Sequence, residues 1–196
     1  MTDNHRKIRS WLKSGTELPD EAIAGIMGNM EAESNCEPCR LQGDFSAGRE
    51  RSVAYAAAVD SGEKTAEAFR GDSLGWGLCQ WTYFSRKAEL LEFCRNRGFG
   101  IADLEGQLLF FVYEMQREYP NLWRRLLSCR DVTEATRLVI TEYERPAVLN
   151  TDQRAAYARQ FYEEFHTEGS GDNALTKAIT LAEQVLELLR GMEAIQ

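Results

Sequence analysis

The sequence lacks any long hydrophobic run. Its longest apolar stretches, such as Leu108–Tyr113, are far too short to span a bilayer. The first residues are polar and charged, with no apolar segment of the kind found in a secretory signal peptide. We therefore expect no membrane partner. A protein with this N-terminus that acts outside the cell would need another route of delivery.

Basic residues are in the minority. The chain has 23 Lys and Arg against 31 Asp and Glu, which gives a formal net charge of −8. Nucleic-acid binding depends on Lys and Arg that neutralise phosphates, so this charge argues against nucleic acid as the main partner. It also argues against binding to an anionic membrane surface. With 196 residues, 43% of them hydrophobic, the chain can bury one sizeable core.

Histidine is scarce and cysteine is odd in number. His5 and His166 lie near the two ends, and five cysteines fit poorly with a full disulfide framework. Cys36 and Cys39 have C-x-x-C spacing, but neither a second zinc-ligand pair nor a thioredoxin-like βαβ pattern accompanies them. We expect no metal and no cofactor. The two cysteines would form a local disulfide or remain free thiols.

Hydrophobic residues recur at helical spacing through most of the chain, which predicts a mainly α fold. The expected helices lie at about 7–13, 22–34, 50–59, 63–69, 85–97, 103–118, 131–142 and 151–165. We expect one domain over 1–167, a linker at 168–173 and an amphipathic helix at 174–196. Heptad spacing in this last helix is compatible with docking on the domain or with binding another protein.

The apolar run at 22–34 is the most informative segment, because it ends in Glu33. Gly25 and Gly28 each cost about 1 kcal/mol inside a helix and so indicate that another backbone packs closely there. Glu33 would lie in the last turn, at the edge of the core, where desolvation raises the pKa of a carboxyl. A general acid for glycosidic cleavage needs such a pKa. The alternative is a helix-end carboxylate paired with an arginine.

Asp72 is the candidate for a second functional carboxylate. It precedes a glycine-rich segment, Gly75–Thr82, that predicts a turn or a small β-hairpin. Asp72 could act as the base of an inverting reaction, or it could simply cap the turn. Asp44, in an irregular loop, is a weaker candidate.

Four motifs together resemble the phage tail lysozyme family, the peptidoglycan-degrading domain of phage tail tips. They are GIMGN-x-x-x-ES at Gly25–Ser34, D-S-x-G-aromatic-G-L-x-Q-W-T at Asp72–Thr82, Q-L-x-F at Gln107–Phe110 and Y-E-R-P at Tyr143–Pro146. The first two are also similar to segments of soluble lytic transglycosylases and goose-type lysozymes. The resemblance covers about 7–165 and implies a mainly α, lysozyme-like fold with the glycine-rich turn beside a cleft.

The resemblance implies a peptidoglycan hydrolase that cleaves the β-1,4 bond between N-acetylmuramic acid and N-acetylglucosamine, with Glu33 and Asp72 as catalytic residues. The enzyme would belong to a phage tail or a related particle or mobile element, and would act on the glycan strand of the bacterial wall. Other tail proteins are candidate partners of the C-terminal helix. The alternatives are a lytic transglycosylase that uses Glu33 alone, a non-catalytic glycan-binding or structural tail module, and a zinc-bound adaptor.

The glycine-rich segment also supplies candidates for substrate binding. These are Gly75, Trp76, Gly77, Gln80, Trp81 and Thr82. The glycines would allow close approach of the backbone to a sugar, or serve only the turn. The glutamine and threonine offer hydrogen bonds. The tryptophans offer flat apolar faces, but at most one should contact substrate, because tryptophan at this spacing is more often part of the core.

The Y-E-R-P motif supplies the last two candidates. By resemblance, Tyr143 faces the floor of the cleft, where its hydroxyl would orient Glu33 or the sugar. Glu144 is expected to make a structural ion pair with a nearby arginine.

Overall fold

The structure, a computed structural model, describes residues 1–146 and 149–167. Its helices are α1 (Asp3–Gly15), α2 (Asp20–Ser34), α3 (Glu50–Ser61), α4 (Ala66–Gly71), α5 (Phe84–Arg97), α6 (Leu104–Glu118), α7 (Pro120–Ser128), α8 (Val132–Leu138), the π-helix η1 (Val139–Glu144) and a helix at 151–167. Within these ranges no strand forms, so the prediction of a mainly α, lysozyme-like fold is confirmed. The predicted linker at 168–173 and helix at 174–196 lie outside the described residues.

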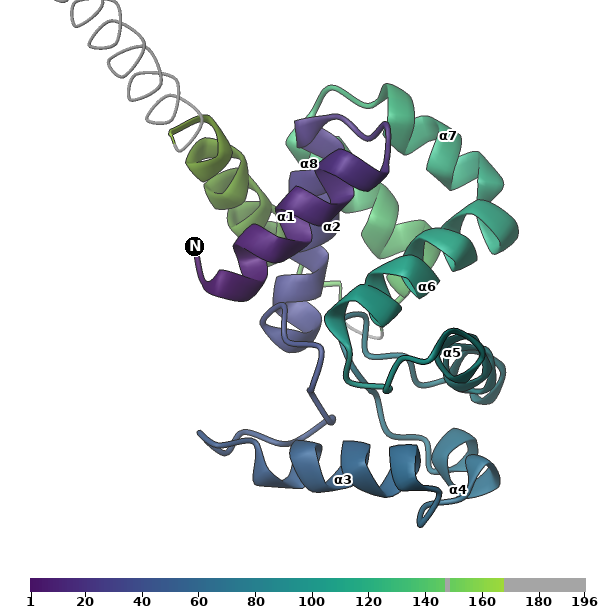
Figure 1. Cartoon of the computed structure of the whole chain (residues 1–196). Coiled ribbons are helices and arrows are strands. Elements are labelled where there is room, and N and C mark those ends of the chain that lie inside the picture. Colours follow the sequence, from purple (N-terminus) through teal and green to yellow (C-terminus); the bar gives the residue numbers. More distant parts are fainter. Residues whose placement is uncertain (147–148, 168–196) are drawn as a thin grey trace, which may run out of the picture.

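Helix α2 lies at the centre of the fold, with α1 and α8 beside it (Figure 1). Ten of its 15 residues are buried, so it presents no polar face to water. A Cβ atom on Gly25 would lie 2.7 Å from the Cβ of Ala135 in α8. On Gly28 it would lie 2.6 Å from the carbonyl oxygen of Arg154, in the helix at 151–167. The predicted close approach of other backbones to α2 is therefore confirmed at both glycines.

The end of α2 is fixed by a change of backbone hand. Asn35 has a φ of 57° and donates its N–H to the carbonyl of Glu31. Just before it, the Ser34 hydroxyl lies 3.0 Å from the carbonyl oxygens of both Met30 and Leu78. The last turn of α2 is thereby tied to the glycine-rich turn. In place of a hairpin, that turn has single antiparallel bridges between Trp76 and two other residues.

Helix α7 was not predicted from the sequence. It begins at Pro120, which occupies a first-turn position that needs no backbone donor. Its buried residues are Leu122, Trp123 and Leu126. These three residues form a short amphipathic pattern that follows the proline. Because α7 follows α6 so closely, however, the hydrophobic patterns of the two helices merge in the sequence.

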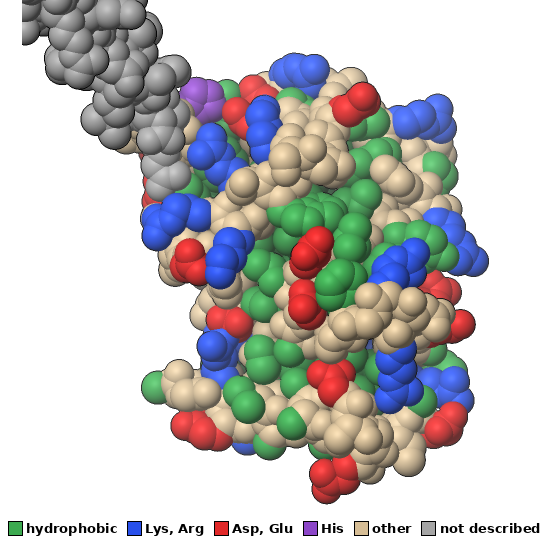
Figure 2. All heavy atoms as spheres, viewed as in Figure 1, with side chains coloured by type: hydrophobic (Ala, Val, Ile, Leu, Met, Phe, Trp, Pro, Cys, Tyr) green, Lys and Arg blue, Asp and Glu red, His purple; other side chains and the backbone are tan. Residues whose placement is uncertain are grey.

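Charges of both signs are mixed over the face shown in Figure 2, and hydrophobic side chains gather near its middle, over α1 and α6. The net charge of −8 is thus not gathered into one patch on this face. Among the described residues, no helix combines the length and the apolar character needed to cross a membrane.

Candidate active site

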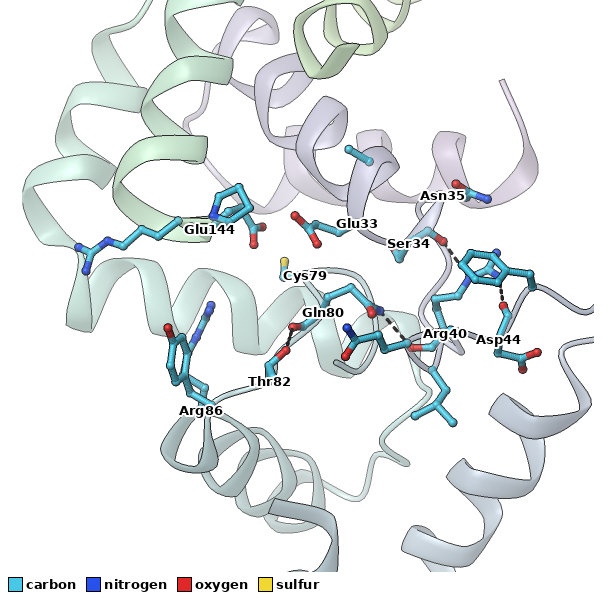
Figure 3. Close-up of a pocket in the computed structure, with 18 residues that line it drawn as sticks. Glu33, Ser34, Asn35, Arg40, Asp44, Cys79, Gln80, Thr82, Arg86 and Glu144 are labelled. Carbon is cyan, nitrogen blue, oxygen red and sulfur yellow. Dashed lines mark hydrogen bonds between the residues drawn. The ribbon is translucent and has the colours of Figure 1, made fainter. Parts of the chain in front are cut away.

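A cleft of about 720 Å³ opens where the end of α2, the glycine-rich turn and the end of η1 meet (Figure 3). It takes residues from segments far apart in the sequence, including the loop between α2 and α3 and the start of α5. Its charged lining residues are Glu33, Arg40, Asp44, Arg86, Glu144 and Arg145. Four of the predicted site residues are therefore brought together in one cleft: Glu33, Gln80, Thr82 and Glu144.

Glu33 lies on the α2 side of the cleft, with 18% of its side chain exposed. Its Oε1 accepts a hydrogen bond of 2.6 Å from Arg154. Arg154 is only 5% exposed and also donates to Oδ1 of Asn29, one turn earlier in α2. Glu33 therefore both lines the cleft and pairs with an arginine, two arrangements that the sequence analysis treated as alternatives.

Glu144, the last residue of η1, lies across the cleft from Glu33 (Figure 3). Burial, followed by the negative charge of Glu33, raises the pKa of Glu144 to about 8, although Arg86 and Arg154 oppose this shift. Among the described residues, no arginine forms the ion pair predicted for Glu144. Arg86 instead makes two hydrogen bonds, of 2.6 and 2.8 Å, to the buried carboxylate of Glu114.

Asp72, the candidate for the second catalytic carboxylate, is not among the residues that line the cleft. It accepts hydrogen bonds of 2.6 Å from both Tyr55 and Lys87, caps the turn through the N–H of Leu74, and is 3.1 Å from Nζ of Lys64. Burial opposes ionisation, but these donors outweigh it and lower the pKa of Asp72. Asp72 therefore caps the turn, as the alternative interpretation predicted, and also forms a buried ion pair with Lys87.

The glycine-rich turn contributes two of its six candidates to the cleft. Gln80 and Thr82 line it, with the threonine hydroxyl 2.8 Å from the carbonyl of Gln80. Gly75 and Gly77 do not line it and instead serve the turn. Gly77 has a φ of 71°, and a Cβ atom there would lie 2.5 Å from the side chain of Gln107.

Neither tryptophan of the turn lines the cleft. Trp76 and Trp81 are both fully buried, and their indole N–H groups donate to the carbonyl of Ile101 and to the Glu114 carboxylate. Neither indole ring is therefore exposed to a molecule bound in the cleft. The glycines fold this short segment tightly, and both indole rings therefore point into the core.

Tyr143 is also buried, and its expected contact with Glu33 is not made. Its hydroxyl donates a 2.6 Å hydrogen bond to Glu114, which also accepts from Trp81 and Arg86. Glu114 thus organises the wall beneath the cleft, a role missed in the sequence. The signal was present, because position 114 follows Phe111 by three residues on the apolar face of α6.

The loop after α2 supplies the weaker carboxylate candidate, Asp44, and an aromatic cleft residue, Phe45, that the sequence did not mark. Asp44 lines the cleft, but both of its carboxylate oxygens accept hydrogen bonds from Ser46 and Ser52. Those bonds hold its pKa well below the usual range. Beside it, Phe45 is 92% exposed, and Tyr83, also on the cleft, is 71% exposed.

All five cysteines are free thiols, so the local disulfide is not formed between Cys36 and Cys39. Ligand atoms of His5, Glu31 and Cys36 lie within 4.8 Å of one another and are the described residues that could hold a cation. However, Nδ1 of His5 accepts from the N–H of Thr2, so its Nε2 carries the proton and donates to Glu31 at 3.0 Å. The proton on Nε2 occupies the position at which a metal ion would have to bind this nitrogen.

Comparison with known proteins gives two findings. The model of the phage tail lysozyme family matches residues 3–165. Morphogenesis protein 1 of Bacillus phage B103 is 24% identical over 174 residues, which are 85% of this chain but 39% of that protein. The chain thus spans well under half the length of this relative. Because the family model covers most of the sequence, from α1 into the helix at 151–167, the chain belongs to the phage tail lysozyme family.

Proposed function

We propose that this protein cleaves the β-1,4 bond between N-acetylmuramic acid and N-acetylglucosamine in peptidoglycan, with Glu33 as the proton donor. The observation that carries the proposal is the place of Glu33, at the end of α2 and on the wall of an open cleft. Membership of a lysozyme family supports the reaction class.

The cleft suits the chemistry of glycosidic cleavage. The leaving oxygen needs a proton, and the sugar gains positive charge in the transition state. Glu33 and Glu144 supply carboxyl groups on opposite sides, and the ionised Asp44 adds negative charge farther along the cleft. Such fixed charges stabilise a developing cation without reorganising during the reaction.

Phe45 and Tyr83 are proposed as the apolar surfaces that contact sugar rings. Large aromatic side chains that are exposed beside a polar cleft cost free energy in water unless a ligand covers them. They take the role that the sequence hypothesis gave to one of the two buried tryptophans. The glycan strand would then lie along the cleft between the loop after α2 and the start of α5.

A lytic transglycosylase is the second candidate, and the position of Asp72 favours it. With Asp72 outside the cleft and both oxygens of Asp44 occupied, the unpaired carboxyl that remains opposite Glu33 among the described residues is Glu144, whose raised pKa makes it a poor base for activating water. The two reactions differ in their products, because an anhydro sugar end lacks one water relative to a reducing end. Mass spectrometry of the released muropeptides distinguishes them.

The direct test compares wall cleavage by the wild type, Glu33→Gln and Glu31→Gln. We expect Glu33→Gln to lower the rate of muropeptide release from purified peptidoglycan by at least about 100-fold, because it cannot donate the proton. Glu31→Gln is the matched control, since Glu31 belongs to the same helix but pairs with His5 outside the cleft. Equal release by all three proteins would remove Glu33 from the mechanism.

We further propose that the protein acts as part of a phage tail or related particle. The family and the phage morphogenesis protein that the chain resembles both support this. Detection of the chain in purified particles, and not only in the lysate, is the corresponding test. Its absence from particles that contain other tail proteins would contradict the assignment.

A further inference from the structure

Glu33 and Glu144 come from different elements and point toward one another across the cleft (Figure 3). No described residue makes a hydrogen bond or an ion pair with the Glu144 carboxyl, whereas Glu33 accepts from Arg154. We propose that the two glutamates bind one proton between them and act as a single acid, with Glu144 holding the proton that Glu33 delivers. The delivery step rests on the proposed function, whereas the shared proton does not.

The π-helix explains why Glu144 faces the cleft. It continues directly from α8, and its wider turns change the direction in which successive side chains point. Tyr143 is anchored inward by its hydrogen bond to Glu114, so the next residue is turned outward. Arg145, with a φ of 46°, then ends the helix. The direction of Glu144 is therefore set by the buried contact of its neighbour.

The charged surroundings of Glu144 favour one proton on the pair rather than none or two. The groups whose charges act on Glu144 are Glu33 from α2, Arg86 from α5, Glu114 from α6 and Arg154 from the helix at 151–167. Cys79 from the glycine-rich turn also lines the cleft, but burial raises the pKa of its thiol, which stays uncharged. Arg86 is already neutralised by its two bonds to Glu114. Arg154 is left to balance one negative charge on the pair. A second negative charge would lack a counterion.

The proton balance of the reaction follows from this arrangement. In the resting pair, Glu144 carries the proton and Glu33 accepts the hydrogen bond from Arg154. That proton passes to Glu33 and then to the leaving sugar oxygen as the glycosidic bond breaks. Two carboxylates then face a sugar that has gained positive charge, which offsets their mutual repulsion. The attacking water, or the sugar hydroxyl in a transglycosylase, returns one proton to the pair.

The shared proton is tested first without any substrate. NMR titration of ¹³C-labelled glutamate carboxyls should show Glu144 titrating near pH 8, the pKa to which burial and Glu33 raise it. In Glu33→Gln, the Glu144 midpoint should fall by about one pH unit, because the neighbouring negative charge is gone. An unchanged midpoint in Glu33→Gln would overturn the proposal.

The delivery step is tested by the pH dependence of wall cleavage. At pH 7, we expect Glu144→Gln to lower kcat about tenfold or more with little change in KM, and to move the alkaline limb of the profile to lower pH. Glu144→Asp should partly restore both. Glu142→Gln, two residues earlier in η1 and paired with Arg125, is the matched control with a wild-type profile. An unshifted limb in folded Glu144→Gln would overturn the delivery role.

The two experiments separate this inference from the proposed function. A reciprocal shift in the titration of a protein that fails to cleave walls would uphold the carboxyl pair and overturn the proposed function. Wall cleavage that depends on Glu33, with no shift in the titration, would do the reverse.

Discussion

Two arginine side chains near the cleft pair with different carboxylates. Arg154 is nearly buried and pairs with Glu33 on the wall of the cleft. Arg86 is equally close to the cleft but is committed to Glu114, so it only partly offsets the burial of Glu144. Of the two glutamates in the cleft, Glu33 therefore has a salt-bridge partner, and Glu144 has none among the described residues.

Replacement of Asp72 should affect stability rather than wall cleavage. Asp72→Asn leaves the Lys87 ammonium, whose side chain is 0% exposed, without its charged partner. Removing one partner of a buried pair costs about 3 kcal/mol in the free energy of unfolding. Thermal unfolding should show the loss, while peptidoglycan cleavage below the melting temperature stays at the wild-type rate.

A companion variant checks the cause. Asp72→Asn with Lys87→Met should regain part of the lost stability, because no unpaired ammonium remains. Loss of cleavage in Asp72→Asn at full stability would contradict its placement outside the site.

Protonation of Glu144 should also appear in the pH dependence of stability. Its pKa is about 8 in the folded protein, above that of an unfolded glutamate, so the folded state binds more protons between about pH 4.5 and 8. The free energy of unfolding should therefore fall by about 2–4 kcal/mol as pH rises through that window. In Glu144→Gln this fall should disappear in denaturant titrations at pH 5 and 8, and persistence of the full wild-type fall would contradict the assignment.

At the scale of elements, the site depends on how closely two helices approach α2. Gly28→Ala would place a methyl group 2.6 Å from the carbonyl oxygen of Arg154 and 2.7 Å from Ala158. The helix at 151–167 must then move, which should cost about 1–3 kcal/mol in stability and displace the arginine that holds Glu33. We expect reduced wall cleavage in protein that remains folded, as judged by circular dichroism.

Gly71→Ala is the matched control for that substitution. Gly71 ends α4, and a Cβ atom there meets nothing within 4 Å. Its stability should stay within about 0.5 kcal/mol of the wild type. Comparable losses of stability in both variants would show that the close approach at Gly28 is not the cause of the loss.

The elements were largely predictable from sequence, because helical spacing and the helix-breaking glycines are local signals. The end of α2, the close approach at Gly25 and Gly28 and the loop after it all followed from such signals. The side-chain directions inside the glycine-rich turn did not. Whether Trp76 and Trp81 point outward depends on Ile101 and Glu114, which lie far away in the sequence.

At the scale of the whole molecule, the cleft exists because distant segments converge on the end of one buried helix. The position of Glu33 at the edge of the core was predictable, since a carboxylate at the end of an apolar helix is costly without a partner or a role. Its partner Arg154 was not, because residue 154 is 121 positions away and belongs to a helix whose sequence marks no single arginine. The same long-range folding removes Asp72 from the cleft and brings Glu144 into it.

The most direct measurement is a crystal structure of Glu33→Gln with a tetrasaccharide of alternating N-acetylglucosamine and N-acetylmuramic acid. The account predicts the sugar chain in the cleft, rings against Phe45 and Tyr83, and a glycosidic oxygen about 3 Å from the side chain at position 33. A sugar chain bound elsewhere on the surface, or with every glycosidic oxygen turned away from position 33, would contradict it.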